Sequence, residues 1–284
     1  MVPSVSLFAS AVRPHLWDEL LMSLKNNIYS YEVVFAGFID NEITAPFKEK
    51  YPEFRYILMD DLKPAQCYEV ARRNCTGELI GWIADDCRFS ERFIDKVYDY
   101  WQSLNNVKAV ISCKTNENGQ NETMLNHRFF GRNQNTPLMA PIGIMSRDYL
   151  NNIGGFDKRF LCGQYENQCV MMVYSDGGKV HLYEDVCVEI DHKNKHGSTT
   201  NFWSGYNEDR EQLENSWVIG GYQPNPKPIL VIEGVKPPYW YHPINNTEVT
   251  LKRNDKHEPY KDMDILTKTQ GPCGRWMGNG DFDE

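Results

Sequence analysis

The sequence predicts an α/β fold, in which helices cover both faces of a mainly parallel sheet and an irregular C-terminal extension follows. Two observations lead to this prediction. Through residues 5–200, apolar runs typical of strands alternate with segments of helical periodicity, as in parallel sheets. Residues 204–284 instead hold eight of the fifteen prolines and three of the seven tryptophans, with sparse periodicity. We therefore predict one domain over residues 1–203, and an extension over residues 204–284 that packs on it.

The first part of the domain is predicted to alternate strands with helices. Strands are expected where apolar residues cluster, at residues 5–9, 31–37, 54–59 and in the run that ends at Asp85. One helix is expected after Pro14, because four leucines then recur on one face. A second begins at Pro64, which suits the first helical turn, and a third follows Ser90, which suits the N-cap position.

The second part of the domain is predicted to continue this alternation. Strands are expected at residues 107–111 and 186–190, and helices at residues 146–153 and 166–176. Residues 138–145 form an apolar run before the first of these helices. The polar stretch from Lys114 to Asn126 lacks periodicity, so we expect an exposed loop there. Within the extension, residues 207–218 fit a helix and residues 229–232 fit a strand.

Composition restricts the partners and the cellular setting. The chain has 284 residues, and 30 Lys and Arg against 39 Asp and Glu give a formal net charge of -9. Such a balance argues against nucleic acid or anionic lipid as the main partner. No run approaches the ~18 apolar residues of a membrane span, and the first residues lack the pattern of a signal peptide. We expect a cytoplasmic protein whose eight cysteines are buried thiols.

The feature most suggestive of chemistry is the apolar run from Glu78 to Ala84, which leads directly into Asp85 and Asp86. In open α/β sheets, ligands bind outside the carboxyl ends of the strands. Two carboxylates there suit a hard divalent cation, which is often shared with substrate phosphates. The alternative is an acidic turn, since Asp is common in turns. The chain has no P-loop, G-x-G-x-x-G, G-x-S-x-G or H-E-x-x-H signature.

Three segments together are similar to one enzyme family. They are Thr76 to Asp86, then Ile153 to Phe160 with the sequence I-G-G-F-D-K-R-F, then Gly163 to Glu166. In this order and at this spacing they resemble the GT-A fold glycosyltransferases, specifically glycosyltransferase family 2, over residues 5–200. The first segment is similar to the DXD region of that family, and the second to the segment before its catalytic carboxylate.

The resemblance implies a metal-dependent, inverting glycosyltransferase, which moves a sugar from a nucleotide diphosphate donor to a hydroxyl acceptor such as a glycan. A UDP-sugar is the favoured donor, and Mn²⁺ or Mg²⁺ the expected cofactor. Asp86 is expected to bind the metal, and Asp85 to lie toward the ribose or act as a second ligand. His192 is expected as a further metal ligand, the alternative being a surface histidine.

The resemblance also assigns a base and a donor site. Glu166 falls where the family carries its catalytic carboxylate, so it is expected to be the general base; the alternative is an ordinary helix-start Glu, and Asp157 is the neighbouring candidate. The donor is expected to lie against the ends of the first four strands. The residues expected there, besides Asp85, are Ala9, Ser10, Arg13, Gly37, Asp60 and Lys63.

Two rival functions remain open at this stage. A sugar-1-phosphate nucleotidylyltransferase shares the nucleotide-binding architecture, but it would be expected to have a glycine-rich loop after the first strand, and residues 9–14 contain no glycine. A binding protein of the same fold without catalysis is the second rival.

Overall fold

The computed structural model of the chain describes residues 2–59, 63–117, 138–156, 160–190, 209, 217–218 and 252–253. Asp60, Asp157, His192 and the strand expected at residues 229–232 lie outside the described residues.

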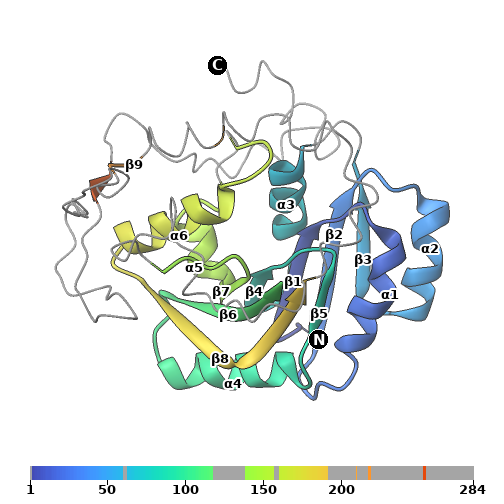
Figure 1. Cartoon of the computed structure of the whole chain (residues 1–284), viewed down its shortest axis with the longest axis horizontal. Helices are drawn as coiled ribbons and strands as arrows, with labels where there is room; N and C mark the ends of the chain where they lie inside the picture. Colours follow the sequence, from blue (N-terminus) through green and yellow to red (C-terminus); the bar gives the residue numbers. More distant parts are fainter. Residues whose placement is uncertain are drawn as a thin grey trace.

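A single sheet of eight strands forms the centre of the described domain, in the order β3-β2-β1-β4-β7-β6-β8-β5 (Figure 1). The strands are β1 (Val5–Ser10), β2 (Tyr31–Gly37), β3 (Phe54–Leu58), β4 (Leu79–Trp82), β5 (Cys87–Phe89), β6 (Ala109–Glu117), β7 (Gly143–Ser146) and β8 (Lys179–Ile190). The pairs β1–β2, β1–β4, β2–β3 and β6–β8 are parallel, whereas β4–β7, β6–β7 and β5–β8 are antiparallel. The sheet is therefore mixed, with its parallel half formed by the first four strands.

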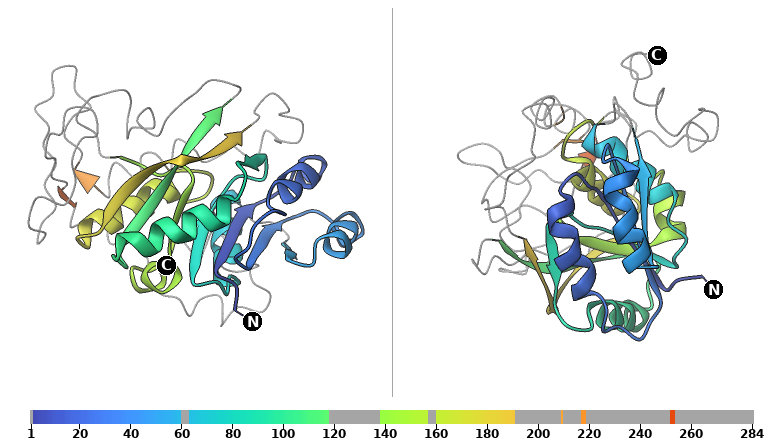
Figure 2. Two further views of the ribbon diagram at one scale, coloured as in Figure 1. Left: turned by 90° about the horizontal axis from the view of Figure 1, so that it is seen from below. Right: turned by 90° about the vertical axis from the view of Figure 1, so that its right-hand side faces the viewer.

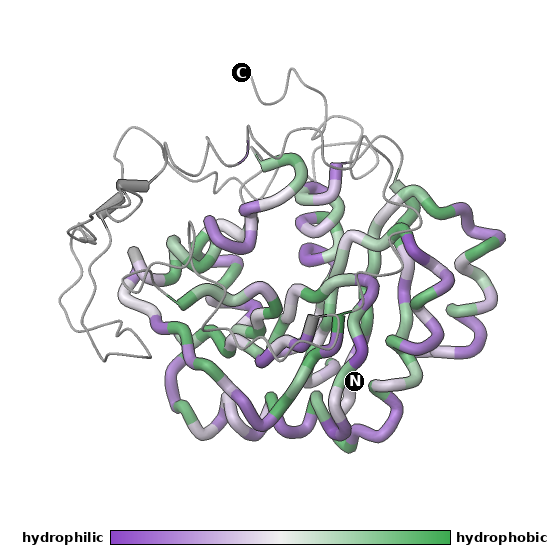
Figure 3. The backbone as a smooth tube through the Cα atoms, viewed as in Figure 1, coloured by the Kyte–Doolittle hydropathy of each residue, from purple (hydrophilic) through white to green (hydrophobic). Residues whose placement is uncertain are grey.

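Helices cover both faces of the sheet, as predicted. They are α1 (Pro14–Ser23), α2 (Asn41–Lys50), α3 (Pro64–Arg73), α4 (Phe93–Leu104), α5 (Arg147–Asn152) and α6 (Tyr165–Ser175). One apolar core packs α3, α5 and α6 against the face that carries Phe8 and Val34. The other packs α1 and α4 against the face that carries Leu7 and Val33. Alternate residues of β1 and β2 thus enter opposite cores, which explains why these strands are buried along nearly their whole length and are mostly apolar (Figure 3).

Several elements differ from the sequence prediction. Strand β5 was not expected, and the N-cap residue of α4 is Arg92, not Ser90 as predicted. Helix α2 was not predicted, because Pro46 lies inside it and Thr44 is its only buried residue. Strand β8 is longer than predicted, and β6 continues to Glu117 where a loop was expected, because the two strands pair along their lengths despite polar side chains (Figure 2). Trp217–Val218 forms β9 and pairs with β10 (Lys252–Arg253), so the helix expected over residues 207–218 is wrong at its end.

Two further findings concern the environment of the chain. The seven described cysteines are thiols, six of them buried and one half-buried. In the described ranges, no helix combines the length and apolar character needed to cross a membrane.

Candidate functional site

Asp85 and Asp86 lie in the turn between β4 and β5, at the carboxyl end of the parallel half of the sheet. The backbone N–H of Ile83 donates to the carbonyl of Phe8 (3.0 Å), which holds this turn beside β1. Both aspartates are buried, with side chains 3% and 1% exposed. Buried carboxylates require partners, so the groups around them define the site.

The carboxylate of Asp85 holds the loop between β1 and α1. Its Oδ2 accepts hydrogen bonds from the backbone N–H groups of Val12 (2.7 Å) and Arg13 (2.9 Å), and its Oδ1 accepts one from Arg13 Nε (2.8 Å). Both oxygens of Asp85 are therefore engaged by the first loop of the chain.

Arg13 bridges the two aspartates. Its Nη2 pairs with Asp85 Oδ1, and its Nη1 pairs with Asp86 Oδ2 at 2.5 Å. Burial lowers the pKa of Arg13, but attraction to Asp85 and then to Asp86 outweighs burial and raises this pKa above its ordinary value. Arg13 therefore stays charged and is paired with both buried aspartates.

Ala9, Ser10 and Gly37 lie at the ends of β1 and β2, where the sequence placed them. Ala9 and Ser10 are buried. A Cβ on Gly37 would lie 2.5 Å from the carbonyl oxygen of Ala11 and 2.7 Å from the hydroxyl oxygen of Tyr56, so only glycine fits. The Tyr56 hydroxyl donates to that carbonyl at 3.0 Å. Gly37 thereby allows Tyr56 to fix the loop that leads to Arg13.

Lys63 is the N-cap residue of α3, and its backbone N–H donates to Gln66 Oε1 at 3.1 Å. Its place at the start of α3 agrees with the prediction, although its role toward a donor stays a prediction.

Glu166 is the second residue of α6 and lies in the first helical turn, as predicted. Its Oε2 is inaccessible to solvent, and no described residue donates a hydrogen bond to it. Burial raises the pKa of Glu166 to about 7; a hydrogen bond from its own backbone N–H opposes this shift, and the nearby charge of Asp209 adds to it. A carboxylate with a pKa near neutrality is suited to accept and release a proton at physiological pH.

Tyr68 on α3 connects the aspartate turn with Glu166. Its hydroxyl donates to the carbonyl oxygen of Ile83 at 2.5 Å, and its ring centroid lies 4.7 Å from that of Tyr165. Burial raises the pKa of its hydroxyl, and the charges of Asp85 and Glu166 both contribute to this shift. Tyr68 thus contacts both the segment that leads to Asp85 and Tyr165, the neighbour of Glu166 in sequence. The sequence did not single out this residue, because it lies beside the apolar stripe of α3 with no motif around it.

The glycine-glycine-phenylalanine segment is positioned by a buried ion pair on α3. Glu69 accepts hydrogen bonds from Arg72 Nε (2.6 Å) and from the backbone N–H of Phe156 (3.1 Å). Burial raises the pKa of Glu69, but its pairing with Arg72 outweighs burial and lowers this pKa below its ordinary value. Gly155 has φ +72°, and a Cβ there would lie 2.7 Å from Arg72 Nη2. The motif therefore carries a packing role next to the candidate base.

The chemistry of the aspartate pair partly suits a divalent cation. Carboxylate oxygens are the ligands that Mg²⁺ and Mn²⁺ prefer, but no third His, Cys, Asp or Glu joins them to form a cluster within the described residues. The oxygens of Asp85 already accept several hydrogen bonds, whereas for Asp86 the guanidinium of Arg13 is the cation in place. Asp86 therefore fits a divalent cation better than Asp85, provided that the Arg13 side chain moves.

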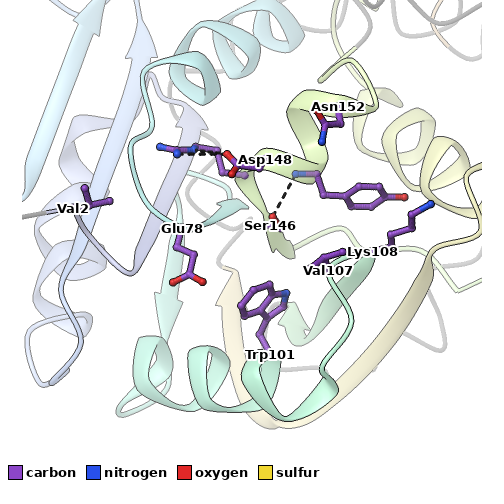
Figure 4. A pocket seen from close by; sticks show the side chains of 10 residues that line it. Val2, Glu78, Trp101, Val107, Lys108, Ser146, Asp148 and Asn152 are labelled. Atoms are coloured by element: carbon purple, nitrogen blue, oxygen red, sulfur yellow. Dashed lines mark hydrogen bonds and ion pairs between the residues drawn. The ribbon is translucent and has the colours of Figure 1, made fainter.

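A cavity of about 550 Å³ lies at the opposite end of β4 (Figure 4). Its charged groups have partners within the protein: Glu78 accepts from the Tyr98 hydroxyl at 2.6 Å, and Lys108 pairs with Asp176 at 2.9 Å. Because it is separated from Asp85 by the length of the strand, this cavity is distinct from the candidate site.

Comparison with known proteins places the fold. No family model matches the chain, and no curated protein matches its sequence. Among solved structures, TarS 1–349 of S. aureus in complex with UDP-GlcNAc has a TM-score of 0.57 and 15% identity, over 75% of this chain and 67% of that one. GalNAc-T7 with UDP, GalNAc and Mn²⁺ has a TM-score of 0.52 and 8% identity, over 75% and 51%. Uncomplexed TarS 1–349 has a TM-score of 0.54 at 15% identity, with 66% of this chain covered.

These likenesses confirm the predicted GT-A fold. This chain spans 60% of the length of uncomplexed TarS 1–349.

Proposed function

We propose that this protein is a nucleotide-sugar-dependent glycosyltransferase, which moves a sugar from a UDP-sugar to a hydroxyl group of an acceptor such as a glycan. The observation that carries the proposal is the pair of carboxylate environments beside Tyr68 in a GT-A fold. The Tyr68 hydroxyl contacts the segment that leads to Asp85 and Asp86, which are paired with the Arg13 guanidinium. The Tyr68 ring packs against Tyr165, which precedes Glu166, the residue with the raised pKa. The neighbours TarS and GalNAc-T7 were solved with UDP-GlcNAc and UDP, which supports a nucleotide-sugar donor.

The donor diphosphate is proposed to meet Arg13 and Asp86 at the ends of β1 and β4. Arg13 can bind phosphate oxygens in a fork geometry, since its guanidinium is planar and stays charged. We propose that Asp86 is the main ligand of a divalent cation, with Asp85 and His192 as the further predicted ligands. Such a cation, when bound, would neutralise charge on the leaving diphosphate.

Glu166 is proposed to be the general base. Its ionised carboxylate takes the proton of the acceptor hydroxyl while the hydroxyl oxygen forms a bond to the anomeric carbon. The bond from that carbon to the diphosphate oxygen breaks at the same time, and the nucleoside diphosphate leaves. Attack from the face opposite the leaving group inverts the anomeric configuration, as the resemblance to the family implies.

The first experiment is a thermal-shift screen of UDP, GDP, CDP and their sugars, with Mn²⁺ or with EDTA. A ligand that binds only the folded state raises the melting temperature, so we expect UDP-sugars with Mn²⁺ to give the largest shift. No shift with any nucleotide would refute the donor site.

A transfer assay then separates an enzyme from the rival binding protein. Glu166→Gln should keep the thermal shift but lower transfer by about 10²- to 10⁴-fold, because it removes a general base. Glu184→Gln, at an exposed position of β8, is the matched control and should behave as wild type. Donor binding without transfer or donor hydrolysis in the wild type would favour the binding protein, and release of diphosphate from a nucleoside triphosphate would favour the nucleotidylyltransferase.

A further inference from the structure

Asp209 makes an unusual set of contacts for a residue beyond the predicted domain. It is 1% exposed. Its carboxylate accepts hydrogen bonds from three successive backbone N–H groups, those of Leu161 (2.8 Å), Cys162 (2.5 Å) and Gly163 (2.8 Å). Successive N–H groups that converge in this way form an anion-binding concavity. Here the anion is a side chain that lies 46 to 48 positions further along the chain.

The loop that Asp209 binds leads directly into α6. Gln164, its last residue, has a left-handed backbone conformation with φ +64°, which few non-glycine residues adopt. At its other end, the carbonyl of Leu161 accepts from the backbone N–H of Ala65 in the first turn of α3 (2.9 Å). The conformation of this loop therefore determines where Glu166, two residues after Gln164, is placed.

We propose that Asp209 is a positioning residue for Glu166. It anchors the loop before α6, and so fixes the position of the Glu166 carboxylate, which takes the proton from the hydroxyl group of the sugar acceptor. This inference rests on the proposed function of Glu166. Asp209 itself touches no reacting atom in the proposal. Its second contribution is electrostatic, because a negative charge close to Glu166 disfavours ionisation of that carboxyl group.

The other titratable groups around Glu166 do not supply this charge. Tyr68 approaches from α3, and Tyr165 and Cys169 lie on α6 itself. Burial raises the pKa of all three groups, so they are neutral at physiological pH. Asp209 is thus the neighbour whose charge adds to burial in raising the pKa of Glu166.

The contacts also bear on how the chain is organised. Asp209 lies in the segment predicted to be an extension, and its three hydrogen bonds join this residue to the loop of the main domain. Through Asp209, a residue outside the predicted domain of residues 1–203 thus contributes to the candidate active site.

The test uses Asp209→Asn in the full-length protein, with Asp176→Asn as the control. Asp176 is the exposed carboxylate at the other end of α6. The side-chain amide introduced by Asp209→Asn presents one acceptor oxygen and an NH₂ group to three N–H donors, so the loop amides lose part of their acceptor. Hydrogen exchange measured by mass spectrometry should show faster exchange over residues 161–164 in Asp209→Asn, and wild-type exchange in Asp176→Asn.

The second measurement is the pH profile of transfer. In Asp209→Asn we expect kcat to fall by about 10- to 100-fold, as for a small misplacement of a catalytic group, while donor affinity stays within about twofold. The acidic limb of the pH profile should move to lower pH, because the charge that helps to raise the pKa of Glu166 is removed. Asp209→Glu, which keeps the charge, should restore the acidic limb better than Asp209→Asn. Wild-type exchange over residues 161–164, or an unchanged kcat and acidic limb, would overturn the proposal. If Glu166→Gln retains full transfer, the proposed base is wrong, and the exchange result still decides whether Asp209 anchors the loop.

Discussion

Replacing the proposed base should stabilise the protein, in a manner that depends on pH. The perturbation is Glu166→Gln, which removes an ionisable group whose Oε2 is buried and whose pKa is raised from an ordinary 4.5 to about 7. Between these two values the folded state binds more protons at this site than the unfolded state. The free energy of unfolding therefore decreases as pH rises through this window.

The magnitude follows from the shift itself. A rise from 4.5 to about 7 is about 2.5 pKa units, and at about 1.36 kcal/mol per unit the ionised Glu166 lowers stability by roughly 3 kcal/mol above pH 7. The contribution disappears below about pH 4, where the group is protonated in both the folded and the unfolded state. Gln cannot ionise, so Glu166→Gln should gain roughly 2.5 kcal/mol relative to wild type on going from pH 5 to pH 8.

The assay is urea unfolding of both proteins at pH 5 and pH 8, with the denaturant slope checked for two-state behaviour. Any loss of packing or of a hydrogen bond caused by Gln is present at both pH values, so it cancels in the comparison. Glu184→Gln, at an exposed position, is the control variant measured at both pH values. If Glu166→Gln shifts stability equally at the two pH values, the raised pKa, and with it the reasoning for a base, is refuted.

Three further predictions follow from the site. Arg13→Ala should bind Mn²⁺ more tightly than wild type without nucleotide, because the guanidinium no longer competes for Asp86; calorimetry would show this, and an unchanged affinity would contradict it. Gly155→Ala should lower the free energy of unfolding by about 1–3 kcal/mol, because Gly155 has a positive φ and an added Cβ would lie too close to the Arg72 side chain. An unchanged urea midpoint would contradict this. Glu69→Gln should lower the free energy of unfolding by about 3–5 kcal/mol at pH 7, because it breaks the buried ion pair between Glu69 and Arg72. Because pairing lowers the pKa of Glu69 from 4.5, this deficit should shrink as pH falls below 4.5, and a deficit of constant size would contradict the assignment.

The positions of the candidate residues followed from local sequence pattern. An apolar run that ends at Asp85 and Asp86 predicts carboxylates at a strand end, and the helical period after Gly163 predicts Glu166 near a helix start. Both placements agree with the structure, because strands and helix starts depend on residues close in sequence.

The contacts of these residues could not be predicted in the same way. Arg13 meets Asp85 and Asp86 across 72 and 73 positions, and Asp209 meets Leu161 across 48. Such pairings depend on which strands become neighbours, and β1 lies beside β4 only because the sheet order is not the sequence order. The missed helix α2 has a related cause, since Pro46 and the scarcity of apolar residues hide it from any periodicity argument.

The two halves of the candidate site differ in how their carboxylates are compensated, and this difference supports separate roles. Asp85 and Asp86 share the cation Arg13, an arrangement that pairs both buried carboxylates with one guanidinium. Glu166 instead lies near a second carboxylate, Asp209, with its Oε2 buried, an arrangement that disfavours ionisation and suits proton transfer. Tyr68 lies between the aspartate turn and the start of α6, and burial raises the pKa of its hydroxyl, so it is neutral and adds no third charge between the two groups of carboxylates. The candidate site therefore combines an ion-paired aspartate turn with a carboxyl group whose pKa is raised to about 7.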